Sequence, residues 1–149
     1  MPAKKATTVS DGFTAEERAA MKERAAELRA EGKKGAKKAD GLQQLLDRVA
    51  SMDPDDRALA ERVHVVVSKH APDLLPKTYY GMPAFANDEG KVVTFMQPAD
   101  KFKARYATIG FEDRANLDDG DFWPIGFAVR TWTPAIEQRY SELVASAVS

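Results

Sequence analysis

Carboxylate side chains gather in three short stretches of this sequence, and such groups can bind metal ions. The stretches are Asp53/Asp55/Asp56, Asp88/Glu89 and EDRANLDDGD at residues 112–121. Carboxylate oxygens are the hard donors that iron, manganese, magnesium and calcium accept, so Asp118, Asp119 and Asp121 in the densest stretch are candidate metal ligands. The loop does not match an EF-hand, because Ala115 and Leu117 stand where oxygen ligands are needed. Helix caps, a hairpin turn and a solvated loop would explain the three groups without a metal.

The two histidines, His64 and His70, do not form a metal-binding pair. They are six positions apart on a predicted helix, about 120° from each other around its axis, whereas a shared metal needs an i, i+4 pair. His70 falls on the apolar stripe near the end of that helix, where a structural histidine is expected. The sequence contains no cysteine, which excludes disulfides, thiolate metal sites, iron–sulfur clusters and cysteine nucleophiles.

Basic residues alternate along a segment that the sequence predicts to be a strand. Lys101, Lys103 and Arg105 would then share one face and form a candidate anion-binding stripe. The alternative is a strand with polar side chains toward solvent and apolar side chains toward a core. The lysines of residues 33–38 could contact phosphate weakly. With 22 Lys+Arg against 23 Asp+Glu, the net charge of −1 disfavours nucleic acid as a partner.

Two clusters of aromatic residues and proline could line a pocket for a small ligand or peptide, if their strands adjoin. The alternative is that they are ordinary core aromatics. The residues of this candidate site are Tyr80, Gly81, Met82, Pro83 and Phe85 in the first cluster and Trp123 and Pro124 in the second.

Known catalytic motifs are absent from the sequence. It contains no nucleophile elbow, P-loop, dinucleotide-binding fingerprint or zincin motif. None of its serines has a partner histidine that the spacing reveals. We therefore expect a non-enzymatic protein.

Helical periodicity predicts four helices, which together with the strands must position the candidate site residues. Thr14 and Glu17 form a capping-box pattern at the start of a helix over 14–30. Further helices are predicted over 42–52 and 54–70, and the last begins at Thr133-Pro134 and runs to about residue 147. Between the first two, GKKGAKKADG at residues 32–41 has the composition of a flexible linker.

A period of two from residue 77 onward predicts four strands, at 78–86, 91–97, 102–109 and 125–132. The turn at 87–90 makes the first two antiparallel neighbours. Pro83 cannot donate to a sheet ladder, which predicts an edge strand or a bulge there. The fold class is therefore α+β: a single domain with an antiparallel sheet of about four strands, packed by N-terminal and C-terminal helices.

The length of 149 residues allows one ordinary core. We expect a disordered tail at 1–13, the first helix and linker at 14–41, and the α+β domain at 42–149. No apolar run is long enough to span a bilayer and no secretory signal follows Met1, so we expect a cytoplasmic protein without a membrane partner. The first helix could dock on its own domain or on a second copy, which would give a homodimer.

Several segments together resemble the YdhG-like bacterial family of unknown function, in its actinobacterial form. They are YGMPAF at 80–85 followed by GKVV at 90–93, KFKARYAT at 101–108 and DGDFWP at 119–124, with an N-terminal extension similar to that subgroup. The resemblance covers nearly the whole chain and implies a small α+β domain. Some members of the family are labelled intracellular iron chaperones by analogy with frataxin, so iron is the cofactor that the resemblance implies.

Three functions follow as hypotheses. The first is a non-enzymatic binding protein that handles iron through surface carboxylates. The second is a small-ligand or peptide pocket between the two aromatic clusters. The third is a weak anion- or nucleic-acid-binding module.

Overall fold

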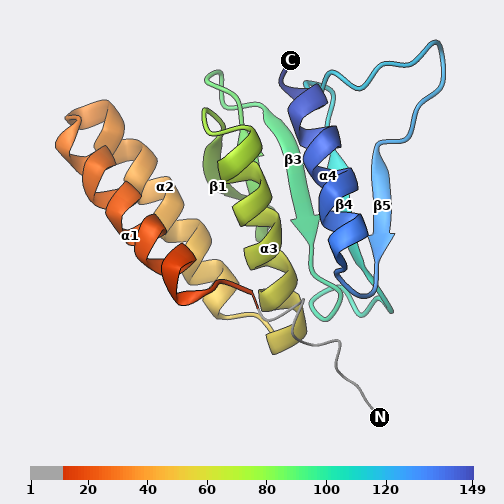
Figure 1. Cartoon of the computed structure of the whole chain (residues 1–149), viewed down its shortest axis with the longest axis horizontal. Helices are drawn as coiled ribbons and strands as arrows, with labels where there is room; N and C mark the ends of the chain where they lie inside the picture. The colour runs from red at the N-terminus through yellow and green to blue at the C-terminus, as the bar shows by residue number, and fades with distance from the viewer. Residues whose placement is uncertain (1–11) are drawn as a thin grey trace.

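The computed structural model describes residues 12–149, which form four helices and a five-stranded antiparallel sheet (Figure 1). The helices are α1 (Ala15–Ala30), α2 (Lys33–Ala50), α3 (Pro54–His70) and α4 (Pro134–Ala147), and the strands are β1 (Leu75–Tyr79), β2 (Met82–Ala86), β3 (Val92–Gln97), β4 (Ala107–Phe111) and β5 (Gly126–Val129). The predicted α+β class, with helices before and after the sheet, is confirmed. Among these residues no helix is both long and apolar enough to cross a lipid bilayer.

The sheet is a meander in which each strand pairs with the next, in the order β1-β2-β3-β4-β5. The predicted hairpin at 87–90 is confirmed, because it joins the antiparallel strands β2 and β3. The single strand predicted over 78–86 is wrong, because Tyr80 and Gly81 have positive φ angles of 52° and 77°. Two successive residues of this kind close a two-residue hairpin, which makes β1 and β2 separate strands and adds one strand to the sheet.

Of the two alternatives predicted from Pro83, the edge strand is wrong, whereas the strand does contain an irregularity, two residues after the proline. β2 lies between β1 and β3, and the irregularity in its pairing is at Phe85/Ala86. Pro83 is tolerated in this interior strand because the pairing of β2 with β3 begins only at Ala84, one position after the proline.

The segment before β4 is a turn, although alternation predicts a strand from residue 102. The carboxylate of Asp56 on α3 accepts hydrogen bonds from the backbone N–H groups of Ala99 and Asp100, both at 3.0 Å. The chain then folds back through a bond from Ala104 N–H to the Ala99 carbonyl, at 2.9 Å. A contact from a helix some forty residues earlier therefore overrides the local β pattern.

Residues 33–41 are not a flexible linker, since they form the first half of α2. Gly35 and Ala39 are buried, and a Cβ atom at Gly35 would collide with the carbonyl oxygen of Leu28 on α1. A Cβ atom at Gly41 would lie 2.6 Å from the carbonyl oxygen of Pro76 on β1. The small residues therefore allow α2 to approach both α1 and the sheet closely, while Lys34 and Lys37 remain exposed.

The start of α1 is held by local and distant contacts. The predicted capping box is confirmed, because the Thr14 hydroxyl accepts from Glu17 N–H at 3.0 Å and the Glu17 carboxylate accepts from Thr14 N–H at 2.9 Å. Residues 1–11 of the predicted disordered tail lie outside the described residues. Gly12 and Phe13 do not behave as a tail, since Gly12 is buried and Phe13 N–H donates to Glu61 at 3.1 Å.

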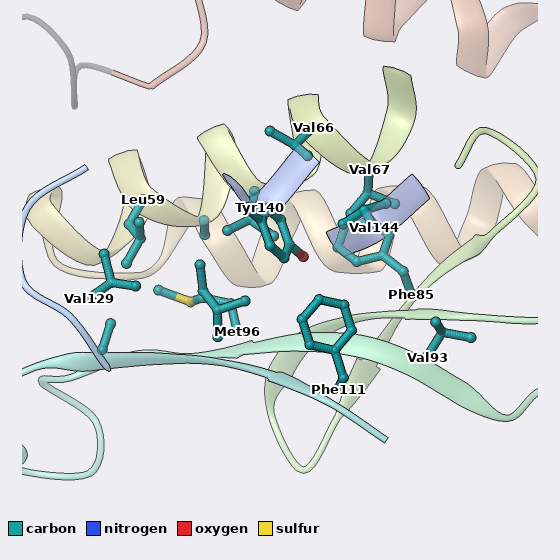
Figure 2. Packing of buried hydrophobic residues seen from close by; sticks show 14 of the residues in the cluster. Leu59, Val66, Val67, Phe85, Val93, Met96, Phe111, Val129, Tyr140 and Val144 are labelled. Atoms are coloured by element: carbon teal, nitrogen blue, oxygen red, sulfur yellow. The ribbon is translucent and has the colours of Figure 1, made fainter. Parts of the chain in front are cut away.

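The main core lies between the sheet and the layer of α3 and α4 (Figure 2). Phe111 and Met96 rise from the sheet toward α3 and α4, and Tyr140 reaches down from α4. Thr94 is fully buried and pairs with the Tyr140 hydroxyl at 2.9 Å and with the Gly110 carbonyl at 2.9 Å. Burial raises the pKa of the Tyr140 hydroxyl, so this buried polar pair remains neutral.

Candidate functional site

An apolar cavity of about 140 Å³ lies between the α1–α2 hairpin and α3, above the first two strands. An apolar cavity of roughly 150 Å³ is large enough to hold benzene. Its apolar walls come from α1, α2, α3, β2 and the segment that leads into β1; they include Leu28, Leu42, Val67, Leu74 and Phe85. In Figure 1 the α1–α2 hairpin stands to one side of α3, and this cavity occupies part of the space between them.

His64 lines this cavity and is the buried polar side chain in its lining. Its side chain is 3% exposed and packs between the rings of Phe13 and Phe85, at centroid distances of 5.8 and 5.5 Å. Nδ1 of His64 is buried and has no hydrogen-bond partner within residues 12–149. Burial lowers the pKa of His64 to about 4, so the imidazole is neutral near pH 7.

A neutral imidazole offers one N–H donor and one acceptor nitrogen. Leaving such a group buried without a partner costs about 1–3 kcal/mol. Nδ1 itself has almost no accessible surface, so a ligand in the cavity can bind it only after the imidazole or its neighbours shift. A ligand hydroxyl or carboxyl group that binds Nδ1 in this way would recover part of that free energy, whereas a purely apolar ligand would not. The cavity can therefore select a molecule that combines an apolar body with one polar group.

Two cationic side chains line the same cavity. Arg24 belongs to α1 and Lys38 to α2. Arg24 is half exposed and has only long contacts with Glu27 and Glu31, at 3.7 and 3.8 Å. Exposed pairs of this kind are weak, so Arg24 can exchange them for a ligand anion, and Lys38 forms no ion pair within residues 12–149.

Contacts at the N-terminal end of α1 hold this wall of the cavity in place. The Arg62 guanidinium on α3 binds Glu17 through Nη1 at 2.9 Å and Glu137 of α4 through Nη2 at 3.0 Å. Glu137 also accepts a bond from Trp132 Nε1 at 3.0 Å. Burial alone would raise the pKa of Glu137, but the hydrogen bonds from Trp132 and Arg62 outweigh burial and lower it. These contacts fix α1 to α3 and α4.

Two larger hollows do not combine mainly apolar walls with a buried, unpartnered polar atom that lacks other contacts on the same side chain. One of about 470 Å³ lies between α3 and α4, and one of about 650 Å³ lies near the C-terminus. Charged side chains of both signs line each of them, including Arg62 and Glu142 in the first and Arg114 and Asp88 in the second. Nε of Arg62 has no partner among the described residues, yet its other two nitrogens already bind three oxygens. The polar requirement of this side chain is therefore largely met.

The predicted pocket between the two aromatic clusters does not form, because β3 and β4 separate β2 from β5. Tyr80 is 81% exposed at the hairpin turn, beside half-buried Gly81. Met82, Pro83 and Phe85 are buried in β2, whereas Trp123 is half-buried and Pro124 exposed in the β4–β5 loop. Phe85 is the member of this set that lines the His64 cavity, on the helix-facing side of the sheet.

The predicted basic stripe is wrong, because Lys101, Lys103 and Arg105 lie in the turns before β4 rather than on a strand. Lys101 instead reaches the β1–β2 hairpin, with Nζ 3.5 Å from the Tyr80 carbonyl oxygen. Arg48 donates from Nε to the neighbouring Gly81 carbonyl at 2.7 Å. The basic residues therefore do not share a face.

The acidic candidates Asp118, Asp119 and Asp121 are all exposed in the β4–β5 loop. Within residues 12–149, no three His, Asp or Glu side chains are grouped closely enough to hold a metal ion. The structure thus does not assemble these three carboxylates into a coordination site.

His64 is the site residue that sequence reasoning missed. The predicted structural histidine, His70, is exposed, whereas His64 is buried. A signal was present, because Ala60, His64, Val67 and Ala71 form a second apolar stripe at helical spacing. A helix with two apolar faces is packed on two sides, and the second side of α3 faces the α1–α2 hairpin.

No protein-family model matches this chain, and comparison with curated proteins and with solved structures gives no significant match.

Proposed function

We propose that this protein is a non-enzymatic binding protein for a small organic acid with an apolar body, held between the α1–α2 hairpin and α3. The observation that carries the proposal is a cavity with mainly apolar walls that is also lined by the buried imidazole of His64, whose Nδ1 has no partner within residues 12–149, and by two cationic side chains. The cavity volume of about 140 Å³ limits the apolar body to one ring or a short branched chain. Arg24 and Lys38 favour a carboxylate as the polar group of the ligand.

The test is a titration of the full chain with a small panel of compounds, followed through the NMR signals of the His64 imidazole. The panel contains benzoate, para-hydroxybenzoate, cyclohexanecarboxylate and the uncharged benzyl alcohol. We expect saturable binding of the acids, with dissociation constants of about 1 mM or tighter for ligands of this size. Benzyl alcohol should bind more weakly than benzoate, because it lacks the charge that Arg24 and Lys38 attract.

Matched variants locate the site. His64→Leu removes the imidazole but keeps an apolar side chain, and Leu28→Phe fills the cavity, so both should abolish the titration. His70→Gln changes the exposed histidine and should leave binding unchanged. The proposal is wrong if no acid binds, or if binding survives in both His64→Leu and Leu28→Phe.

Iron binding, which the resemblance to the YdhG-like family implies, stays a prediction. Ferrous iron can be titrated without oxygen in the same experiment. Saturable binding that disappears when Asp118, Asp119 and Asp121 are all changed to Asn would support it. A titration without binding would leave the organic acid as the ligand class to pursue.

A further inference from the structure

Within residues 12–149, the outer edge of β5 is an apolar edge of the sheet that pairs with no other strand. Among residues 12–149, β5 pairs with β4 alone, whereas α2 packs against β1 at the opposite end. Edge strands of monomeric proteins are usually protected by charged residues, prolines, bulges or a covering segment. Residues 122–129 read FWPIGFAV and contain no charge, and the strand itself contains no proline. This edge is therefore suited to pairing with another strand.

Large apolar side chains stand in solvent beside this edge. Phe122 is 92% exposed and Ile125 is 57% exposed, both in the loop between β4 and β5. Figure 1 shows that this loop extends away from the sheet before it returns into β5. Large exposed apolar side chains of this kind are typical of interaction sites.

The same region contains an apolar cleft that could receive such a side chain. The cleft lies between α4 and β5 and has a volume of about 130 Å³. Phe127, Ile136 and Leu143 form its walls, and a volume of this order accepts a benzene ring. The chain thus presents both a projecting ring at Phe122 and a cleft of matching size.

The charges around the projecting loop and the cleft are complementary. Asp118, Asp119 and Asp121 are exposed on the loop that precedes β5, and Arg130, directly after β5, is exposed as well. Arg139 is exposed, lines the cleft and lies 5.5 Å over the Phe127 ring. None of these five side chains forms an ion pair within the described part of the chain. Acidic residues before β5 and basic residues after it would face each other if two β5 strands paired antiparallel about a two-fold axis.

We propose that two copies of this chain form a two-fold dimer through the outer edge of β5. The two β5 strands pair antiparallel, which continues the antiparallel sheet from one copy into the other. Phe122 of each copy enters the α4–β5 cleft of the other, and the acidic loop residues face the partner's Arg130 and Arg139. This proposal does not depend on the ligand proposed above, because the His64 cavity lies at the other end of the helical layer.

The test measures the molar mass of the full chain by light scattering and sedimentation, from low to high micromolar concentration. We expect a dimer for the wild type and a monomer for Phe122→Asp, with the dissociation constant raised by at least about tenfold. Phe122 is almost fully exposed, so circular dichroism should show an unchanged fold. Tyr80→Asp is the matched control, since it also places a charge at an exposed aromatic position, and it should leave the dimer intact.

Charge exchange tests the geometry more closely. Arg139→Asp and Asp121→Arg should each weaken the dimer, and the double variant should recover part of the loss. A wild type that stays monomeric at every concentration overturns the proposal. A dimer that is insensitive to Phe122→Asp also overturns it. Met21 is a half-buried residue of α1, and a dimer lost instead in Met21→Asp would support the contact through the first helix that the sequence predicts.

Discussion

At the β1 end of the sheet the chain covers its own apolar surface, whereas at the β5 end it leaves large apolar side chains in solvent. Helices α1 and α2 pack over the first strands and enclose His64, which is 3% exposed. At the other end, Phe122 is 92% exposed and β5 has an unpaired edge within the described residues. The two ends therefore differ in what they offer a partner, since one encloses a small cavity and the other exposes large apolar side chains beside an unpaired strand edge.

The difference depends on how close the backbone segments come. Gly35 and Gly41 let α2 contact α1 and β1 with no side chain in between, and the Arg62 contacts fix the start of α1. No comparable segment within residues 12–149 lies on the outer side of β5. Stability at the β1 end should therefore respond strongly to substitution, and stability at the β5 end should respond little.

The largest effect that we predict is a loss of stability in acid that depends on His64. The pKa of His64 is about 4 in the folded state, against its usual value of 6.5 in an unfolded chain. Between these values the unfolded state binds a proton that the folded state excludes, so stability is complete above pH 6.5 and falls as the pH drops toward 4. Linkage gives about 1.4 kcal/mol per pH unit, or about 3 kcal/mol in total.

The measurement is urea unfolding of the wild type and His64→Leu over this pH range. Carboxylates contribute equally to both proteins, so the difference between the two curves isolates His64. Burial is the cause of the lowered pKa of His64, and the charged side chains that line the cavity beside it are the cations Arg24 and Lys38, so no carboxylate of the lining stabilises the imidazolium. Parallel curves for the two proteins would contradict the burial of a neutral imidazole.

The second prediction concerns Gly35→Ala, which distinguishes a helix crossing from a flexible linker. In an unpacked helix the change would stabilise by about 1 kcal/mol through helix propensity. At Gly35 the added Cβ atom meets the backbone carbonyl of Leu28, so we expect a net loss of about 2 kcal/mol from overpacking. Urea unfolding measures the change, with Lys37→Ala at an exposed position of the same helix as a control. A stabilised Gly35→Ala variant would show that α1 and α2 do not pack as described.

The sequence predicted the parts of this fold that depend on local periodicity. The stripes of α3 and α4 and the Thr14–Glu17 capping box were recognisable because their residues lie within a few turns of one another. The turn at 99–104 was missed, because Asp56 holds it from more than forty positions away. A local β pattern cannot reveal such a contact.

The candidate site was harder to predict than the fold. The glycines and lysines of residues 32–41 predict a flexible linker from composition alone. Only the packing of α1 on α2 shows that Gly35 is a close-contact position in a helix. His64 has a lowered pKa because Phe13, Phe85 and the α1–α2 hairpin bury it, and these groups are distant in the sequence. The sequence contains the apolar stripe through His64, but the stripe alone does not say that Nδ1 lacks a partner.

The smallest predicted effect is at the β5 end, where Phe122→Ser should change the stability of the monomer by no more than about 0.5 kcal/mol, as is usual for exposed positions. The measurement is thermal unfolding at a protein concentration low enough for the wild type to be monomeric. At higher concentration the wild type should gain stability relative to Phe122→Ser, because association stabilises the folded state by mass action. A large loss for Phe122→Ser at low concentration would mean that this ring is buried within its own chain, and the contrast between the two ends of the sheet would then disappear.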